Sequence, residues 1–302
     1  MSSEDKLSVS KFMIIVGVIT AGLLVLYVPP AVDFSITNPF WNGYTVVSDR
    51  LNATVIDKPL TFPIKNPNKI VIITIPYSKY IDLEIENLKN FVKNGGTLII
   101  LDDYGYANQI LRAFGDYVTI INNTMLVDSL FNYRNGRLPK IIEFSEDPDV
   151  ANITQVVFNH ASVLYILSPK VKVLAYSSSF SFLDDNLNGI CDPGECKGPF
   201  PVIAKFTYGS GVVYVISDPS FLLNSMIDIG DNYKLILNLV KDKSVWIDQY
   251  HLKGNIHYQI RKYIVTVVNW LLHPYISPYI TAVFMMSILI MIMRVMRKRG
   301  VS

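Results

Sequence analysis

The sequence is poor in the residues that most often carry soft-metal and nucleophilic chemistry. Its 302 residues include only two cysteines and four histidines. A zinc site is not expected, because Cys191 and Cys196 have no histidine beside them. A serine nucleophile of the G-x-S-x-G kind is also lacking, since Ser210 lies between two glycines in a predicted hairpin.

The net charge is small as well. The 27 lysines and arginines nearly balance the 25 aspartates and glutamates, which leaves a formal charge of +2. No basic stripe interleaved with aromatic residues occurs in the middle of the chain, so no nucleic-acid partner is expected. Half of the residues are hydrophobic and 18 are tyrosines, a composition that argues against disorder and allows one substantial core or two small ones.

Two apolar blocks near the ends differ from the rest of the chain. The first precedes Pro29-Pro30 and the second precedes a basic tail. The first block has seventeen residues, and a helix of that length spans about 25 Å, which is close to the thickness of a bilayer core. We predict transmembrane helices at 12–29 and 274–293, the first in preference to a buried core helix or a cleaved signal peptide.

Basic residues flank both blocks on the side that faces away from the centre of the chain. This asymmetry predicts that both termini, 1–11 and 294–302, are cytoplasmic. The sequence thus predicts a two-pass protein of the cell membrane with an extracytoplasmic domain at 30–250. An apolar stripe within 251–273 predicts an amphipathic juxtamembrane helix, and the lipid bilayer is an expected partner.

Three glycosylation sequons lie in the predicted outer domain, at Asn52, Asn122 and Asn152. A disulfide between Cys191 and Cys196 would also persist in that compartment. Both features are consistent with an extracytoplasmic location.

The outer domain has the pattern of an α/β fold. The apolar runs 70–75 and 97–101 are predicted as strands that are buried on both faces. Between them, apolar residues at three- and four-residue steps predict a helix at 81–93, ended by Gly95-Gly96. Strand, helix and strand form a crossover unit of a parallel sheet. Residues 201–217 are predicted to form a hairpin.

Aspartates follow two of the strongest predicted strands. Asp102 and Asp103 close the strand that ends at Leu101, and Asp218 follows the second strand of the hairpin. The carboxyl ends of parallel strands are the usual ligand site of such sheets, so these residues are the candidate catalytic or metal-binding carboxylates. The alternative is that they cap the next helix and solvate a loop.

The most specific motif is the twelve-residue segment 184–195. It has oxygen-bearing side chains at positions one, three, five, nine and twelve and glycine at six, the pattern of an EF-hand calcium loop. The predicted ligands are Asp184, Asn186, Asn188, Ile190 through its carbonyl, Asp192 and Glu195. Because Lys197–Pro201 cannot readily begin an exiting helix, the predicted calcium is structural, with a Cys191–Cys196 disulfide locking the loop. The alternative is a polar surface turn without metal.

Several motifs together resemble one family. They are Pro39–Gly43, the segment Glu84–Leu101 with its Gly-Gly-Thr-Leu, Gly198–Val202, Gly209–Ser220 and Asp231-Asn232. They are similar to an uncharacterised, archaeal-like prokaryotic family of membrane-anchored proteins with a domain like class I glutamine amidotransferases. The resemblance implies a flavodoxin-like three-layer sandwich with a mainly parallel sheet. Amidotransferase activity is not expected, because neither cysteine follows a strand on a nucleophile elbow.

These observations favour a non-catalytic binding or scaffold domain in a membrane transport or cell-surface assembly system, with membrane-protein partners. The alternatives are an extracytoplasmic hydrolase that uses the strand-end carboxylates and a purely structural surface protein. The lack of a recognisable Ser/His/Asp or Cys/His arrangement favours binding over catalysis.

Overall fold

The computed structural model describes residues 31–61 and 63–252 and, beyond them, only residues 13, 14, 16, 17, 20–22, 260, 263–267, 279 and 286. Residues 31–253 form one compact unit, and residues 1–30 with 254–302 form another. The fold described below is that of the first unit.

Helices and strands alternate along the first half of this unit, and strands dominate the second half. The helices are α2 (Thr45–Arg50), α3 (Asp82–Lys93), α4 (Asn108–Ala113) and α5 (Asn232–Val240), with 3-10 turns η1 (Pro67–Lys69), η2 (Pro148–Val150) and η3 (Ser220–Leu222). The strands are β1 (Thr54–Ile56), β2 (Ile70–Thr74), β3 (Thr97–Leu101), β4 (Val118–Ile120), β5 (Met125–Asp128), β6 (Lys140–Ile141), β7 (Glu143–Phe144), β8 (Val156–Val157), β9 (Leu164–Ile166), β10 (Lys172–Tyr176), β11 (Ser181–Asp184), β12 (Pro201–Tyr208), β13 (Gly211–Ile216) and β14 (Ser244–Asp248).

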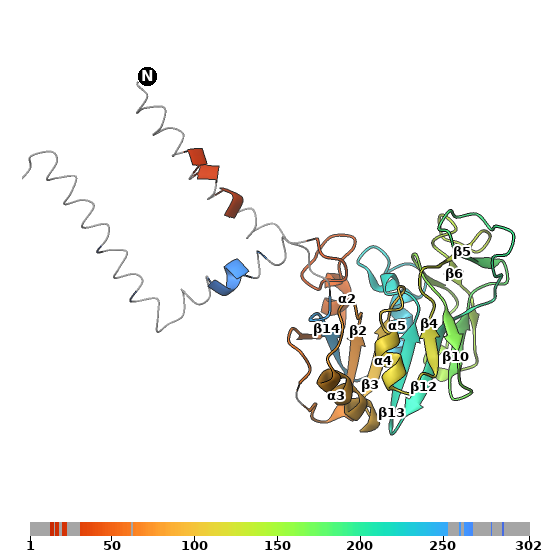
Figure 1. Cartoon of the computed structure of the whole chain (residues 1–302), viewed down its shortest axis with the longest axis horizontal. Coiled ribbons are helices and arrows are strands. Elements are labelled where there is room, and N and C mark those ends of the chain that lie inside the picture. The colour runs from red at the N-terminus through yellow and green to blue at the C-terminus, as the bar shows by residue number, and fades with distance from the viewer. Residues whose placement is uncertain are drawn as a thin grey trace, which may run out of the picture. The chain divides into compact units, whose positions relative to one another are not determined.

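An eight-stranded sheet organises the unit, in the order β1-β14-β2-β3-β13-β12-β10-β7 (Figure 1). The first five strands in this order, β1, β14, β2, β3 and β13, are parallel to one another. The remaining three, β12, β10 and β7, are added antiparallel. Smaller two-stranded sheets pair β11 with β5, β4 with β9, and β6 with β8.

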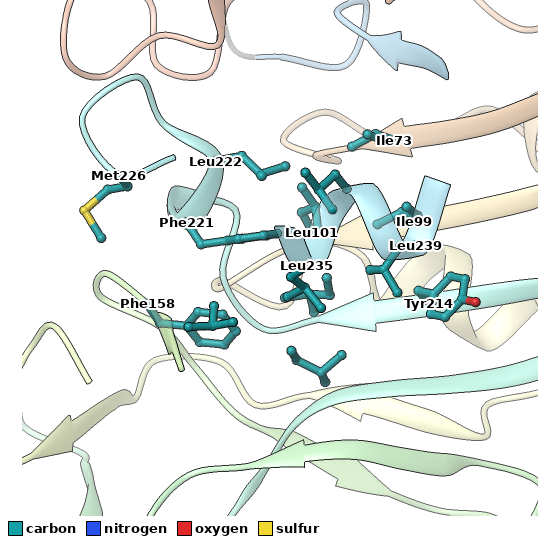
Figure 2. Close-up of a cluster of buried hydrophobic side chains, with 14 of the residues drawn as sticks. Ile73, Ile99, Leu101, Phe158, Tyr214, Phe221, Leu222, Met226, Leu235 and Leu239 are labelled. Carbon is teal, nitrogen blue, oxygen red and sulfur yellow. The ribbon is translucent and has the colours of Figure 1, made fainter. Parts of the chain in front are cut away.

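The two faces of the sheet belong to two separate cores, because successive side chains of a strand point in opposite directions. One core combines Ile72 and Leu98 with residues of α3 and α4. The other combines Ile73 and Ile99 with residues of α5, and Figure 2 shows Leu239 of α5 beside Ile99. Helices α3 and α4 therefore cover one face of the parallel strands, and α5 covers the other.

Gly211, the first residue of β13, lies directly beneath the end of α3. A Cβ atom at this position would be 2.1 Å from the carbonyl oxygen of Val92 and 2.3 Å from that of Gly96. Only glycine permits this close approach of two backbones. The helix that connects β2 to β3 is thereby held against β13.

The first and last segments of the unit are tied together through Gln249. Its Oε1 accepts a hydrogen bond from the backbone N–H of Ile36 (3.0 Å), and its Nε2 donates to the carbonyl oxygen of Phe34 (3.3 Å). The backbone N–H of Ser78 donates to the carbonyl oxygen of His251 (3.0 Å). The two ends of the unit thus lie next to each other, beyond the carboxyl ends of β2 and β14.

The expectation of a flavodoxin-like, mainly parallel sheet is wrong, because the sheet is mixed. The turn Gly209-Ser210 has only two residues between β12 and β13, and a connection this short allows only antiparallel pairing. Strands β10 and β7 then extend the sheet in the same antiparallel manner.

The prediction of two transmembrane helices is also corrected. Within the described residues, no helix is long and apolar enough to cross a bilayer. Most of the predicted spans 12–29 and 274–293, and most of the predicted juxtamembrane helix 251–273, lie outside those residues. The two-pass localisation depends on these spans and is corrected with them.

Candidate functional site

The three aspartates singled out by the sequence meet at one edge of the sheet. Strands β3 and β13 are neighbours, with Leu101 paired to Ile216, and the backbone N–H of Asp102 donates to the carbonyl oxygen of Ile216 (3.1 Å). From this edge the chain leaves β3 toward α4 on one face and leaves β13 toward α5 on the other. Adjacent parallel strands whose connections diverge in this way form a crevice that commonly binds ligands.

Asp102 has a structural role in this crevice. Its side chain is buried, with Oδ1 accepting from the backbone N–H of Tyr104 (2.8 Å) and Oδ2 from that of Ala107 (2.6 Å). Burial raises its pKa, and the hydrogen bonds from Ala107 and Tyr104 oppose that effect. Asp102 therefore holds the turn that leads into α4.

Asp218 is engaged in a similar way. It is fully buried, and its Oδ1 and Oδ2 accept hydrogen bonds from the backbone N–H groups of Ser220 (2.6 Å) and Asn159 (2.8 Å). Burial raises its pKa to about 7, although the hydrogen bonds from Asn159 and Ser220 act in the opposite direction. This carboxylate joins the end of β13 to the segment that follows β8.

Asp103 differs from both neighbours because its Oδ1 is buried without a hydrogen-bond partner among the described residues. Burial raises the pKa of Asp103 to about 8, with further contributions from the charges of Asp218 and then Asp102. Near pH 7 this side chain therefore keeps its proton for much of the time. A protonated carboxyl group can donate a hydrogen bond to an acceptor on a ligand.

Aromatic rings surround these carboxyl groups. The ring of Tyr77 packs edge-on against Tyr106 (5.8 Å between centroids) and Tyr104 (6.2 Å), and tilted against Phe34 (5.7 Å). Burial, and then the charge of Asp103, raise the pKa of Tyr77 well above its usual range. Tyr104 and Tyr106 are more than half exposed, so their rings face solvent beside the carboxyl ends of the strands.

A pocket of about 430 Å³ opens between the loop after β2 and the loop after β3. Its lining includes the aromatic residues Tyr77 and Tyr106 and the cations Lys79 and Arg112. Gln109 of α4 ties the helix that follows β3 to the loop after β2, because its Nε2 donates to the carbonyl oxygen of Tyr80 (2.9 Å). The volume lies within the range of small-molecule sites.

The loop 184–196 follows β11 and is held mainly by its own side chains. Asp184 is buried, and its Oδ1 and Oδ2 accept from the backbone N–H groups of Asn188 (3.1 Å) and Gly189 (2.7 Å). The Nδ2 atoms of Asn186 and Asn188 both donate to Oδ2 of Asp192, at 2.7 Å each.

Glu195 bonds within the same loop, accepting from the backbone N–H groups of Asp185 (3.1 Å) and Asp192 (2.9 Å). The exposed Ile190 donates its backbone N–H to Oδ1 of Asn188 (2.7 Å). The side-chain oxygens of the other five predicted ligands thus accept hydrogen bonds from backbone and amide N–H groups.

The sequence made two predictions about this loop, a disulfide and a metal site. The disulfide is wrong, because both cysteines are free and exposed. Cys196 lies alongside β11, where its carbonyl oxygen accepts from the N–H of Leu183 (3.0 Å), whereas Cys191 belongs to the outer part of the loop. Across the described parts of the chain, no three or more His, Cys, Asp or Glu side chains form a group that could hold a metal ion. Calcium itself stays a prediction from the sequence.

The asparagines of the three sequons are all exposed. Asn52 and Asn152 adopt positive φ angles of 47° and 60°, and Asn122 lies in the loop after β4. Their exposure leaves glycosylation as a prediction.

A buried polar network at the carboxyl ends of β2 and β14 was not predicted from the sequence. Oδ2 of Asp248 accepts hydrogen bonds from the hydroxyl groups of Tyr80 and Thr74 (3.1 Å for Thr74) and contacts Nδ1 of His251 at 2.7 Å. The His251 ring stacks on Tyr80 with centroids 3.5 Å apart, and its Nε2 lies 3.5 Å from Oε2 of Glu84. The signal that could have found it is Asp248, another aspartate at a strand end, three residues before a histidine.

Solved structures with similar shape share little sequence with this chain. The mmIFT52 N-terminal domain is 14% identical over 57% of this chain and 77% of its own, with a TM-score of 0.42. A cytoplasmic protein from Salmonella typhimurium is 15% identical over 61% of this chain and 76% of its own, with a TM-score of 0.39. A beta-galactosidase from Bacillus circulans sp. alkalophilus is 17% identical over 58% of this chain, with a TM-score of 0.36, and the match spans only 22% of that enzyme.

Sequence comparison corrects the resemblance to glutamine amidotransferases. No curated protein matches the chain. The family model that matches covers residues 36–240, and its description names no amidotransferase. The chain therefore belongs to the family described as a domain of unknown function, DUF4350.

Proposed function

We propose that the unit formed by residues 31–253 is a ligand-binding domain that holds a small molecule at the carboxyl ends of β2 and β3 without transforming it. The observation that carries the proposal is the pocket of about 430 Å³ between the loops that follow these strands. It lies beside the point where the connections from β3 and β13 diverge, the usual position of ligands in such sheets.

The lining of the pocket supports a ring-shaped ligand with a negative charge. Tyr77 and Tyr106 provide flat faces on which a sugar or aromatic ring can pack. Lys79 and Arg112 provide positive charge, and the guanidinium of Arg112 suits a carboxylate with two parallel hydrogen bonds. Tyr77 borders both the pocket and Asp103, whose retained proton offers one more hydrogen-bond donor near the site.

The hydrogen bonds of the aspartates support binding over catalysis. Asp102 and Asp218 each use both oxygens to accept from backbone N–H groups, so neither is free to act as a base. The second candidate function is a hydrolase with Asp103 as general acid. It is favoured by the raised pKa of that residue, because a carboxyl group that keeps its proton near pH 7 can protonate a leaving group.

Titration of the purified full chain with glucuronate and salicylate, two ring-shaped carboxylates, tests the binding proposal. Arg112→Ala and Tyr106→Ala should each weaken binding by about tenfold or more, since each removes one of the two main contacts. Arg134→Ala is the matched control, because Arg134 packs on the ring of Tyr133 outside the pocket. If neither probe binds at millimolar concentration, or if the control weakens binding equally, the proposal is wrong.

The hydrolase candidate has a separate test. Release of 4-nitrophenol from 4-nitrophenyl glycosides and esters should occur with the wild-type chain and be lost in Asp103→Asn. Turnover that survives this substitution would exclude Asp103 as the acid.

A further inference from the structure

A second hollow, of about 500 Å³, lies on the sheet away from the carboxyl edge. It borders β10, β12, the first residues of β13 and the residue after α5. Its charged lining consists of Asp147, Asp149, Lys170, Lys172, Lys205 and Lys241. These residues come from distant parts of the sequence, which explains why no sequence motif marks the site.

Two buried aspartates hold the lysines in place. Asp147 pairs with Lys172 (2.7 Å) and Lys205 (2.8 Å), and Asp149 pairs with Lys205 (2.5 Å) and Lys241 (2.9 Å). Asp149 also accepts a hydrogen bond from the hydroxyl group of Tyr214 (2.6 Å). The side chains of the two aspartates are only 3% and 6% exposed, so their positions are fixed by the surrounding protein.

Both aspartates stay ionised at neutral pH. Burial alone would raise the pKa of each, but side-chain hydrogen bonds outweigh this effect. They come from Lys172 and Lys205 at Asp147, and from Lys205, Tyr214 and Lys241 at Asp149. The pKa of each therefore lies below its usual range. The charges around the hollow are thus those of four ammonium groups and two carboxylates.

These charges do not balance. Four lysines less two aspartates leave an excess of +2 around the hollow. Lys170 makes no ion pair in the described part of the chain, and its Nζ lies over the ring of Tyr117, 4.9 Å from the centroid. The side chains of Lys172 and Lys241 are 53% and 58% exposed, so their remaining N–H groups can reach a bound anion. A network that served stability alone would not need this excess.

We propose that this hollow binds a phosphate group, either as inorganic phosphate or as a phosphomonoester. A phosphate carries a charge of about −1.5 to −2 near neutral pH, which matches the excess, whereas a carboxylate would neutralise only half of it. Lysine ammonium groups are compact point charges that bind phosphate well. The hollow is larger than a phosphate, and its remaining wall includes Phe206 and Val212, which suits the apolar body of an ester.

Isothermal titration of the full chain at low salt, with inorganic phosphate and with phenyl phosphate, tests the proposal. Both should bind, with an affinity that falls as sodium chloride screens the charges, and acetate should bind at least about tenfold more weakly. Tighter binding of phenyl phosphate would identify the natural ligand as an ester, and equal binding would identify it as the free ion.

Variants connect this binding to the hollow. Lys172→Gln and Lys241→Gln should each weaken phosphate binding by about tenfold or more. Lys170→Gln should weaken phosphate binding as well. This substitution leaves both aspartates with all their lysine partners, so the variant is informative even if the other two fold poorly. One control should leave the affinity unchanged: Lys58→Gln, in the exposed loop after β1 at the opposite edge of the sheet.

Several outcomes would overturn the proposal. They are the absence of binding by both phosphates at millimolar concentration, equal affinity for acetate, and an affinity that the three lysine variants leave unchanged. None of these results bears on the carboxyl-edge pocket, which is probed by other ligands and other substitutions.

Discussion

Replacing Asp103 by asparagine isolates the free-energy cost of a strand-end carboxylate whose buried Oδ1 has no hydrogen-bond partner in the described part of the chain. In the unfolded chain this group ionises near its ordinary value of 3.8, whereas burial and the charges of Asp218 and Asp102 raise its pKa to about 8 in the folded protein. Between about pH 4 and about pH 8, the folded protein therefore holds this proton when the unfolded chain has lost it. Stability consequently falls as the pH rises through this window.

The size of the effect follows from the two pKa values. The two pKa values differ by about 4, and each pKa unit corresponds to about 1.36 kcal/mol, so the loss of stability at pH 8 is at most about 6 kcal/mol. Asp103 is partly exposed, and solvent screens its repulsion from Asp218, so we expect a cost of about 2 kcal/mol. Asparagine keeps the shape of the side chain and removes this cost.

Urea unfolding of the wild type and Asp103→Asn at about pH 4, 6 and 8 measures the prediction. The variant should be about 2 kcal/mol more stable than the wild type at the highest pH, and the difference should shrink to a few tenths at the lowest. Asp57→Asn, which changes an exposed aspartate, is the control and should show no such trend. If Asp103→Asn is less stable than the wild type at pH 8, or the difference does not depend on pH, Asp103 is ionised and paired and the reasoning is wrong.

Three further predictions concern the stability of the fold. Lys205→Met should lower the free energy of unfolding in urea by about 3 to 5 kcal/mol, because two buried aspartates each lose an ion-pair partner. A loss below about 1 kcal/mol would contradict this prediction. Asn232→Ala should lower the free energy of unfolding by about 3 kcal/mol, because the fully buried amide of Asn232 makes four hydrogen bonds to backbone groups. A melting temperature that is unchanged by circular dichroism would refute this prediction. Gly211→Ala should lower the free energy of unfolding by more than about 3 kcal/mol or prevent soluble expression, because the new Cβ would overlap two carbonyl oxygens. A variant as stable as the wild type would show that α3 can shift.

The parallel part of the sheet was predictable from local patterns. The apolar runs of β2 and β3, the stripe of α3 and the turn at Gly95-Gly96 lie within about thirty consecutive residues, and each signal supports the others. The pairings of β10 with β12 and of β7 with β10 were not, because they join segments that are distant in the sequence and β7 has only two residues. A mixed sheet and a mainly parallel one differ only in these non-local pairings.

The candidate site was predictable in position and not in chemistry. Asp102, Asp103 and Asp218 stand out because they follow strong strands. Their different roles depend on which backbone N–H groups reach them, and Asn159, which bonds to Asp218, lies 59 residues away. The network around Asp248 was missed for the same reason, since its partner Thr74 is 174 residues distant in sequence.

The loop 184–195 shows the reverse case, a strong sequence pattern with a different geometry. Spacing alone predicts convergent oxygens, but Asp184 and Glu195 accept from backbone N–H groups of the loop itself. A polar loop rich in aspartate and asparagine can satisfy its own backbone in this way. The same pattern of aspartate, asparagine and glycine therefore stabilises the turn through its own hydrogen bonds, without requiring an ion.

The hydrogen bonds that join Gln249 to Phe34 and Ile36 have a consequence for how the polypeptide can be rearranged. Because the beginning and the end of this unit are neighbours, a short peptide can link them, and new termini can be opened within the exposed loop 184–196. A circularly permuted chain of this kind keeps every strand of the eight-stranded sheet in its place. The same adjacency lets the unit be inserted into a surface loop of another protein, so that occupancy of its pockets can be coupled to a host's fluorescence or activity.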